Sequence, residues 1–561
     1  MSDQFEIQIK SSNRWSLHSY KSNENEAITE ARQLLKQRIA DEAKVILKKN
    51  EDDEGKIVFS EDQSSQKKKA GLGFIKDSPI FNTVDDLLED QGMQTLATLL
   101  RDYCDQLVIS PTELFHDARA IEKLTDGSLC TSMLDRLAAL QAVKAKENEK
   151  DRRDKLYELL EAAKEKARRS GHDDIGEGKL DDYIKNAGSL SDKDVRYRII
   201  LSISKATMRS SSWEGKLSVL FDLLGEFEPE KLDEKTVVIL DDILCELLSI
   251  QTLVLEMLGH QPDRFNAIKV LTELCIARYE PKKWDTPGLT KTAQLMRKLP
   301  MTKCRANLAD RIEQMLRSRT SLTKGDIFEE KHAFKELLPL FISKSGTILG
   351  GEGMAEALTM CGTRSFNRDR NLDNPAEAIN YIVENLNAPI LQLRFLLTLS
   401  KSQFGQDCAN VVCDFIPKFM DGPEHVHEIV HYKLPLKRKL KIITGLQKMA
   451  LEINLPGKMN LKLVEWLDEL LFNFLDEERI IDKLDSPEET LFVRATGLLQ
   501  FCASGTLIEG KTLNWVRQRV QDHLRQPNFV EKFTEGVETT KKKELIITQL
   551  HAMLKKAGLQ Q

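Results

Sequence analysis

Apolar residues recur at intervals of three and four along most of the chain that follows Phe81. Two clear runs are Leu96, Leu99, Leu100, Tyr103 and Leu107, and Leu463, Leu467, Leu470, Leu471 and Phe474. This spacing places apolar side chains on one face of an α-helix. Only 16 prolines and 28 glycines occur in 561 residues, which favours long helices over many tight turns. The sequence therefore predicts a mainly α protein.

Three short sequences predict where helices begin. In each, a serine or asparagine precedes a proline, and a glutamate follows two residues after the proline, at 110–113, 374–377 and 486–489. The first side chain can accept hydrogen bonds from the free N–H groups of a first turn, where proline has no N–H to leave unpaired. The glutamate can reach back to the N–H of the cap. We expect a helix to start at each of these prolines.

The first 60 residues follow a different pattern. Apolar residues alternate with polar ones at Phe5, Ile7, Ile9, Trp15 and Leu17. Alternation of this kind predicts a β-hairpin. The elements expected after it are a helix at 27–39 and strands at 43–47 and 56–59, with an acidic turn at 50–55 between the two strands. The predicted order is ββαββ, a small α+β module.

Changes in composition divide the rest of the chain. A polar, Ser-rich run predicts a linker, and the charged stretch 144–169, with its narrow apolar stripe, predicts a helix that projects from or bridges two lobes. A coiled-coil contact is the alternative for that helix. The predicted divisions are a module at 1–60, a linker at 61–80, helical domains at 81–170 and 171–342, a glycine-rich joint at 343–373 and a C-terminal helical domain at 374–561.

No repeat of the tetratricopeptide or ankyrin type is present. Successive helices joined by short segments are compatible with a degenerate solenoid of helix pairs, or with two or three compact lobes. The predicted fold class is therefore a small N-terminal ββαββ module followed by a large all-α region that is multi-lobed or solenoid-like.

Bulk composition excludes several classes of protein. Hydrophobic residues make up 41% and charged residues 30%, which is typical of globular domains and excludes collagen-like, wholly disordered and disulfide-rich secreted chains. The nine cysteines are scattered, without a Cys-x-x-Cys spacing, and are expected to be buried thiols in a reducing compartment. The most apolar stretch, 237–258, contains four carboxylates and predicts a buried helix, not a membrane span. The N-terminus lacks a signal-peptide pattern, so a soluble, cytoplasmic protein is predicted.

The sharpest chemical motif is His427-Glu428-Ile429-Val430-His431. On a helix, histidines four apart share a face and can hold zinc, while the glutamate serves as general base. This five-residue resemblance to zinc metallopeptidases makes His427 and His431 candidate metal ligands and Glu428 a candidate catalytic residue. The context favours another interpretation, because Pro435 follows closely and no third ligand lies in a recognisable motif. We expect histidines that flank the buried side of a short amphipathic helix.

Glycines at 346–353 resemble a phosphate loop only in composition. No strand is expected before them and no Gly-Lys-Ser/Thr sequence follows, so a helix–helix joint is expected.

Five basic residues lie close together among apolar residues at Lys433, Lys437, Arg438, Lys439 and Lys441. Such a basic amphipathic segment can contact an acidic protein surface, an anionic membrane or nucleic acid. Tyr432 is the one aromatic residue beside it, and the chain has a net charge of −6, so nucleic acid is not the expected partner.

The predicted function is protein–protein interaction by a non-enzymatic scaffold or regulatory adaptor. Helical arrays offer large contact surfaces, no complete catalytic set is present, and the N-terminal module is expected to bind proteins through its strands. The first alternative is a zinc-dependent hydrolase that uses His427, Glu428 and His431, and zinc is the one cofactor considered. The second is a nucleic-acid-associated regulator that uses Lys67–Lys69 and Lys433–Lys441. The partner's identity and the oligomeric state are not predicted.

Overall fold

The computed structural model describes residues 4–11, 14–36, 42–48, 56–62, 71–170, 180, 182–183, 192–225, 234–343, 346–367, 369–386 and 388–559. These residues are mainly α-helical, with one small antiparallel sheet near the N-terminus. The predicted fold class is thus confirmed, while a solenoid arrangement stays a prediction. The predicted acidic turn at 50–55 and the Lys67–Lys69 run lie outside the described residues.

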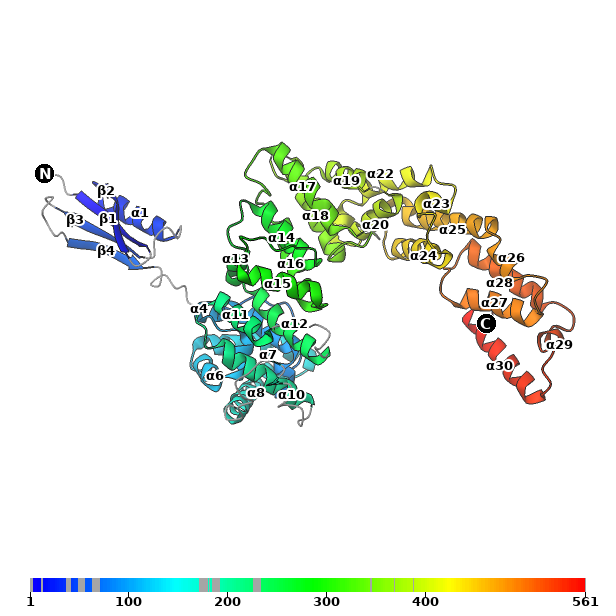
Figure 1. Cartoon of the computed structure of the whole chain (residues 1–561), viewed down its shortest axis with the longest axis horizontal. Helices are drawn as coiled ribbons and strands as arrows, with labels where there is room; N and C mark the ends of the chain where they lie inside the picture. The colour runs from blue at the N-terminus through cyan, green and yellow to red at the C-terminus, as the bar shows by residue number, and fades with distance from the viewer. Residues whose placement is uncertain are drawn as a thin grey trace. The chain divides into compact units, whose positions relative to one another are not determined.

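The N-terminal module has the predicted ββαββ order (Figure 1). Its elements are β1 (Gln4–Ser11), β2 (Arg14–Lys21), α1 (Glu24–Lys36), β3 (Glu42–Lys48) and β4 (Lys56–Asp62). The strands lie in the order β2-β1-β3-β4, and each neighbouring pair is antiparallel. Helix α1 covers one face of the sheet, where the buried residues are Phe5, Ile7, Ile9, Ala27, Ala31, Leu34, Leu35, Ala43 and Val45. The opposite face and the outer edges of β2 and β4 have no partner within this sheet.

The chain divides into two compact units. Unit 1 comprises Met1–Glu228 and Asp242–Leu253, and unit 2 comprises Pro229–Asp241 and Val254–Gln561. The helices of unit 1 after the sheet are α2 (Val84–Leu88), α3 (Asp90–Leu99), α4 (Arg101–Leu107), α5 (Pro111–His116), α6 (Ala118–Thr125), α7 (Ser128–Ala145), α8 (Glu149–Ser170), α10 (Asp192–Thr207) and α11 (Trp213–Leu224). Helices α12 (Glu234–Ser249) and α13 (Gln251–Leu258) contribute residues to both units.

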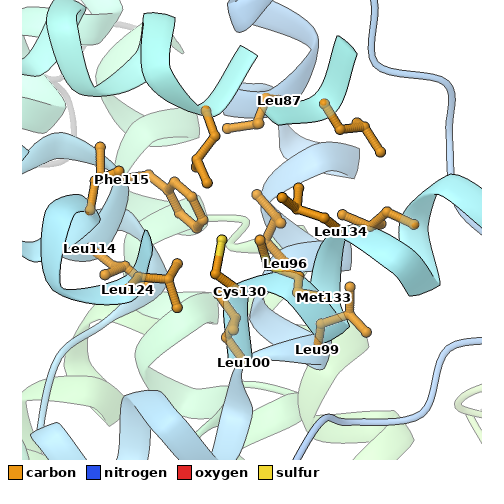
Figure 2. Packing of buried hydrophobic residues seen from close by; sticks show 14 of the residues in the cluster. Leu87, Leu96, Leu99, Leu100, Leu114, Phe115, Leu124, Cys130, Met133 and Leu134 are labelled. Atoms are coloured by element: carbon orange, nitrogen blue, oxygen red, sulfur yellow. The ribbon is translucent and has the colours of Figure 1, made fainter. Parts of the chain in front are cut away.

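Side chains from helices α2 to α8 contribute to a hydrophobic core in unit 1 (Figure 2). Leu87 of α2, Leu96 of α3, Phe115 of α5, Leu124 of α6 and Cys130 of α7 are among the members that Figure 2 labels. Their helical spacing in the sequence is the reason that each helix presents an apolar side to this core.

The charged stretch 144–169 differs from its prediction. Helix α7 ends at Ala145, Lys146 adopts a left-handed conformation, and α8 begins at Glu149. Helix α8 does not project, because Leu156 and Leu160 belong to the core of unit 1. The prediction of a projecting helix treated every charged residue of this stretch as exposed, but Arg152 is fully buried. It donates hydrogen bonds of 2.7 and 3.0 Å to Gln141 Oε1. In the sequence, an arginine whose charge is compensated by hydrogen bonds inside the protein cannot be distinguished from one that is exposed to water.

Unit 2 contains the remaining helices. They are α14 (Arg264–Cys275), α15 (Pro287–Lys298), α16 (Thr302–Arg317), α17 (Ile327–Phe341), α18 (Gly351–Phe366), α19 (Pro375–Glu384), α20 (Pro389–Leu399), α21 (Gln403–Asp407), α22 (Ala409–Met420), α23 (Val426–Ile429), α24 (Leu436–Leu451), the 3-10 helix η2 (Pro456–Lys458), α25 (Met459–Glu477), α26 (Ile480–Leu484), α27 (Leu491–Ala503), α28 (Lys511–Leu524), α29 (Phe529–Phe533) and α30 (Thr540–Lys556). Helices close in the chain pack together, as α16 does with α14 and α18, and α24 does with α25.

The segment 343–373, predicted as a joint, contains a buried helix. Helix α18 occupies 351–366, and Met354, Ala355 and Leu358 are buried in it. Its glycines serve close packing: a Cβ on Gly362 would lie 3.0 Å from the ring of Phe334. Helix α17, and not a strand, precedes this segment, and the described residues 342–343 and 346–350 lie outside the helices.

The three predicted helix starts have three outcomes. At Ser110 the reciprocal capping box forms, as predicted. At Asn374 the helix begins at the proline, but no side-chain cap bond is present. The third prediction is wrong, because residues 486–489 form a turn in which the Glu489 N–H donates to the Ser486 carbonyl at 3.1 Å. Helix α27 starts later, after the N-cap Thr490.

The apolar stretch 237–258 forms parts of two helices, α12 and α13. In the part of the chain that the structure describes, every helix is too short or too polar to cross a membrane. The nine cysteines are unbonded thiols, and seven of them are buried.

Candidate functional site

The structure separates the two histidines of the His427–His431 motif. Helix α23 spans only Val426–Ile429, and Val430 is extended, with φ −116° and ψ 131°. The chain then turns before Pro435, with the Leu434 N–H bonded to the His431 carbonyl at 3.1 Å. His427 and His431 therefore do not share a helical face, which is the geometry that a zinc ion would need. Val426, Ile429 and Val430 are buried and both histidines are exposed, as the amphipathic interpretation predicted.

Glu428 is engaged as a helix cap. Its Oε2 accepts the backbone N–H groups of His425 at 3.0 Å and Glu424 at 2.7 Å. These backbone hydrogen bonds, that of His425 first, hold the pKa of Glu428 below its ordinary value. The neighbouring His425 pairs instead with Glu477, at 3.0 Å. Among the described residues, no three His, Cys, Asp or Glu side chains are grouped in a way that could hold a metal ion. The residues present do not fit a catalytic zinc site.

Lys437, Arg438 and Lys441 lie on the exposed side of α24, Lys439 is partly buried in the same helix, and Lys433 precedes it. The apolar side of this helix is already used, because Leu440, Ile443 and Leu446 are buried and α24 packs on α20 and α25. In α24 and the residues just before it, the exposed large apolar side chains are Tyr432, 64% exposed, Leu436, 36% exposed, and Leu451, 51% exposed, at opposite ends of the helix. An amphipathic helix inserts into a membrane through a free apolar face, which α24 lacks.

Four of these cations are unpaired surface charges. Lys433, Lys437, Arg438 and Lys441 are exposed, and none forms an ion pair with a carboxylate in the described parts of the chain. Lys433 Nζ lies 5.6 Å from the centroid of Tyr432, whose ring also stacks on His431. The cations of this segment are therefore available to a partner, whereas the ring of Tyr432 is already stacked on His431.

The uncovered face of the N-terminal sheet carries large apolar side chains. In the register of the strands, Trp15 lies opposite Lys10 and Ile57 lies opposite Ile46, so these residues face away from α1. We define the open face by its exposed apolar members, which are Trp15 at 40% exposure, Leu17 at 50%, Tyr20 at 48% and Ile57 at 55%. Trp and Tyr are typical of protein interfaces.

Tyr20 reaches the open face because of an irregularity in the strand. Between Ile7 and Gln8 of β1 the register shifts, so that Gln8 lies opposite Leu17 and Ile7 lies opposite Ser19. The extra residue, His18, lies 3.6 Å from Glu30 of α1. Simple alternation from Trp15 and Leu17 does not include Tyr20, and sequence analysis therefore missed it.

Charged side chains of the central strands β1 and β3 lie between the apolar residues of β2 and β4 on the open face, and one of them forms no ion pair within the described residues. Lys10 pairs with Glu42 at 2.6 Å, and Lys48 pairs with Glu6 at 2.8 Å. Burial tends to raise the pKa of Glu6, but its hydrogen bonds with Lys48 and Gln8 outweigh this and leave the pKa lowered. Lys44 forms no ion pair within the described residues, and its Nζ lies 4.3 Å from the centroid of Trp15. The open face thus combines an apolar surface with one available cation.

Unit 1 also contains a buried polar cluster that sequence analysis missed. Lys216 Nζ donates to both carboxylate oxygens of Glu113, at 2.7 and 2.8 Å, which connects α11 to α5. Glu246 of α12 accepts the Thr112 N–H at 2.7 Å. Its burial, offset in part by the hydrogen bonds of Thr112, raises the pKa of Glu246 to about 7.

His116, at the end of α5, belongs to the same cluster. Its Nδ1 lies 2.7 Å from the Thr112 carbonyl, and its ring packs on Tyr197 of α10 at a centroid distance of 4.8 Å. Burial lowers the pKa of His116 to about 4, so it is neutral at pH 7. Carboxylates are so frequent in the sequence that no local pattern marks Glu113 or Glu246. The cluster fastens α5 to α10, α11 and α12, and its groups bond to one another.

Protein-family models, curated proteins and solved structures were compared with this chain, and none matches it. The functional conclusion therefore rests on geometry.

Proposed function

We propose that this protein is a non-enzymatic scaffold or regulatory adaptor that binds another protein through the open face of its N-terminal sheet. The observation that carries the proposal is the set of four exposed apolar side chains from β2 and β4. Three of them lie on edge strand β2 and Ile57 lies on the opposite edge strand β4, all on the same face. Exposed apolar groups on one face favour association, since burial of their surface is worth about 25 cal/mol per Å².

The charges on the central strands of this face favour a partner of particular chemistry. Lys44 is the cation of the open face that pairs with no carboxylate of the described residues, and it lies beside Trp15. A partner segment with apolar side chains and one carboxylate would cover the apolar residues and pair with Lys44. Edge strand β2 offers its outer N–H and C=O groups as well, so an added strand is one way for such a segment to bind.

A cytoplasmic location is part of the proposal. The nine cysteines form no disulfide and most lie buried. Thiols that persist in this number are typical of a reducing compartment.

Affinity capture from native extract tests the proposal with full-length protein. Leu17→Lys places a charge on the open face, and Val143→Lys is the matched control because Val143, on α7, is 80% exposed. We expect a stoichiometric partner with the wild-type protein and the control, and its loss with Leu17→Lys. A partner kept equally by all three proteins, or none captured by the wild type, contradicts the proposal.

The nucleic-acid alternative retains one supporting observation, the unpaired cations of α24 and the segment before it. We rank it second because base stacking needs free aromatic rings, and Tyr432 is stacked on His431. The zinc-hydrolase alternative has no such observation, since α23 ends before His431.

A further inference from the structure

Three arginines of unit 2 converge on the C-terminal end of α16. They come from separate parts of the chain: Arg264 begins α14, Arg364 lies in α18, and Arg370 follows α18. Each donates to backbone carbonyls of the segment 317–320. Arg264 Nη1 bonds to the carbonyl of Thr320, Arg364 Nη1 to those of Arg317 and Ser318, and Arg370 Nε to that of Arg319. Carbonyls at a helix C-terminus lack partners within the helix, so these bonds hold the guanidinium groups in place.

The guanidinium groups lie close together. The four residues whose carbonyls they contact are consecutive and span at most about 11 Å. Arg319, the third residue of this segment, adds a fourth, exposed guanidinium. Burial lowers the pKa of Arg264, and the nearby charges of Arg370 and Arg364 lower it further. We call Arg264, Arg319, Arg364 and Arg370 the arginine cluster.

One carboxylate faces the arginine cluster. Glu330 Oε1 accepts from Arg370 Nη1 at 3.2 Å and from Ser365 Oγ at 3.1 Å. Its carboxylate also accepts the backbone N–H groups of Leu322 and Thr323, each at 2.9 Å. Arg264, Arg319 and Arg364 form no ion pair within the described residues. Among the described residues, Glu330 is thus the carboxylate that pairs with this cluster, which leaves three of the four positive charges without an ion pair.

Several donors of the cluster remain unused. A guanidinium has five N–H groups in a planar fork. For both Arg264 and Arg364, Nη1 is the nitrogen that donates, while Nε and Nη2 have no protein acceptor in the described parts of the chain. The Nη1 bonds hold each guanidinium in place, while its Nε and Nη2 N–H groups stay without a protein acceptor in the described residues. A charged group of this kind is suited to bind an anion with several oxygen atoms.

We propose that the arginine cluster binds a phosphoryl group. At neutral pH a phosphate monoester carries between about −1.5 and −2 charges and has three acceptor oxygens, whereas a carboxylate carries one charge and two oxygens. The phosphoryl group therefore compensates more of the excess charge and satisfies more of the unused donors. Arginine forks bind this group in the bidentate manner that lysine does not provide. The proposal is independent of the open face of the sheet.

A phosphoryl group of this kind has two sources, a phosphorylated metabolite or a phosphorylated side chain of a protein. Titration calorimetry of the full-length protein with pyrophosphate and with O-phosphoserine, at constant ionic strength, distinguishes them. Inorganic phosphate is the common reference and acetate is the carboxylate control. We expect phosphate to bind and acetate to bind at least about tenfold more weakly. Tighter binding of pyrophosphate than of O-phosphoserine would indicate a phosphorylated metabolite, and the reverse order would indicate a phosphorylated side chain.

Two substitutions test the residues. Arg319→Gln removes an exposed guanidinium that forms no hydrogen bond or ion pair within the described residues, so this variant should fold normally. Arg264→Lys keeps the charge and removes the fork. We expect each to weaken phosphate binding about tenfold, the loss expected for one charge-assisted hydrogen bond. Arg297→Gln, an exposed arginine of α15, is the control and should change nothing. No phosphate binding by the wild type, or equal weakening by the control, overturns the proposal.

Discussion

The ammonium group of Lys216 lies 2.7 Å from Oε1 and 2.8 Å from Oε2 of the Glu113 carboxylate, and both side chains are almost fully buried. The pair joins α11 to α5 across the position, at residue 170, where the sequence predicted a domain boundary. Lys216 also donates to the Thr207 carbonyl at 3.2 Å. A buried ion pair with these additional hydrogen bonds fixes how the two helices pack, whatever its net free energy.

Removing one member of this pair should destabilise unit 1 strongly. Lys216→Met leaves the Glu113 carboxylate buried without its cation, which costs about 3–5 kcal/mol of unfolding free energy. Adding Glu113→Gln removes that charge and should recover part of the loss. Calorimetric unfolding of the full-length protein measures both. A single variant as stable as wild type, or a double variant less stable than the single one, contradicts the assignment.

Two buried groups near this pair should give opposite pH dependences. The pKa of Glu246 is raised from 4.5 to about 7, so between these values the folded state binds the extra proton and stability falls as pH rises. The pKa of His116 is lowered from 6.5 to about 4, so between these values the unfolded state binds the extra proton and stability rises with pH. The two contributions oppose each other between about pH 4.5 and 6.5.

Single substitutions should reveal each contribution. Glu246→Gln leaves the histidine contribution, and its stability relative to wild type should rise from pH 4.5 to 6.5 by up to about 1.4 kcal/mol per pH unit. His116→Gln leaves the carboxyl contribution and should show the reverse slope. Unfolding measured at four pH values in that interval tests this. Parallel profiles for the two variants would show that the groups do not titrate as proposed.

Glu428 should act in helix capping and not in metal chemistry. Protein purified without chelator is expected to carry less than one zinc per chain, and His427→Ala should leave the zinc content unchanged. Glu428→Ala should lower the melting temperature, because the N–H groups of His425 and Glu424 lose their acceptor. Glu424→Ala is the control and should have a smaller effect. Stoichiometric zinc that His427→Ala removes would restore the hydrolase alternative.

The basic residues of α24 should not make the protein a nucleic-acid binder. Without free rings to stack bases, binding to single-stranded RNA or DNA is expected only at low salt and should vanish near 150 mM, as purely electrostatic contacts do. Filter binding at several salt concentrations measures this. Binding that persists at 150 mM and is lost in Lys437→Glu, but not in the control Lys283→Glu, would favour the nucleic-acid alternative.

Patterns within one element were sufficient to predict the fold class. Alternation at Phe5, Ile7 and Ile9 gave the sheet, and spacings of three and four gave the helices. Exceptions arose where a residue served an unusual structural purpose. Arg152 is charged but buried, Gly362 lies inside a helix to admit Phe334, and His18 is the extra residue of a bulge. Each of these residues has a structural role that its residue type does not usually have.

Contacts between distant residues had no signal in a single sequence. Arg264 and Arg364 are one hundred residues apart, and each alone is an ordinary helix residue. The same holds for Glu113 and Lys216. The His427–His431 motif gave a signal in the sequence without the structure that it implies. Its five residues match the zinc-binding pattern, but Val430 is extended and ends the helix. A local match carries function only when the backbone conformation agrees.

The most direct test of the proposed function is site-specific cross-linking with the full-length protein. A photoreactive amino acid at position 17 lies on the open face, one at 57 lies on the same face, and one at 143 is the exposed control on α7. We predict that positions 17 and 57 cross-link to the same partner protein in native extract, while position 143 does not. Absence of a cross-link at 17, or an identical product from 143, would contradict the proposal that the open face binds a protein.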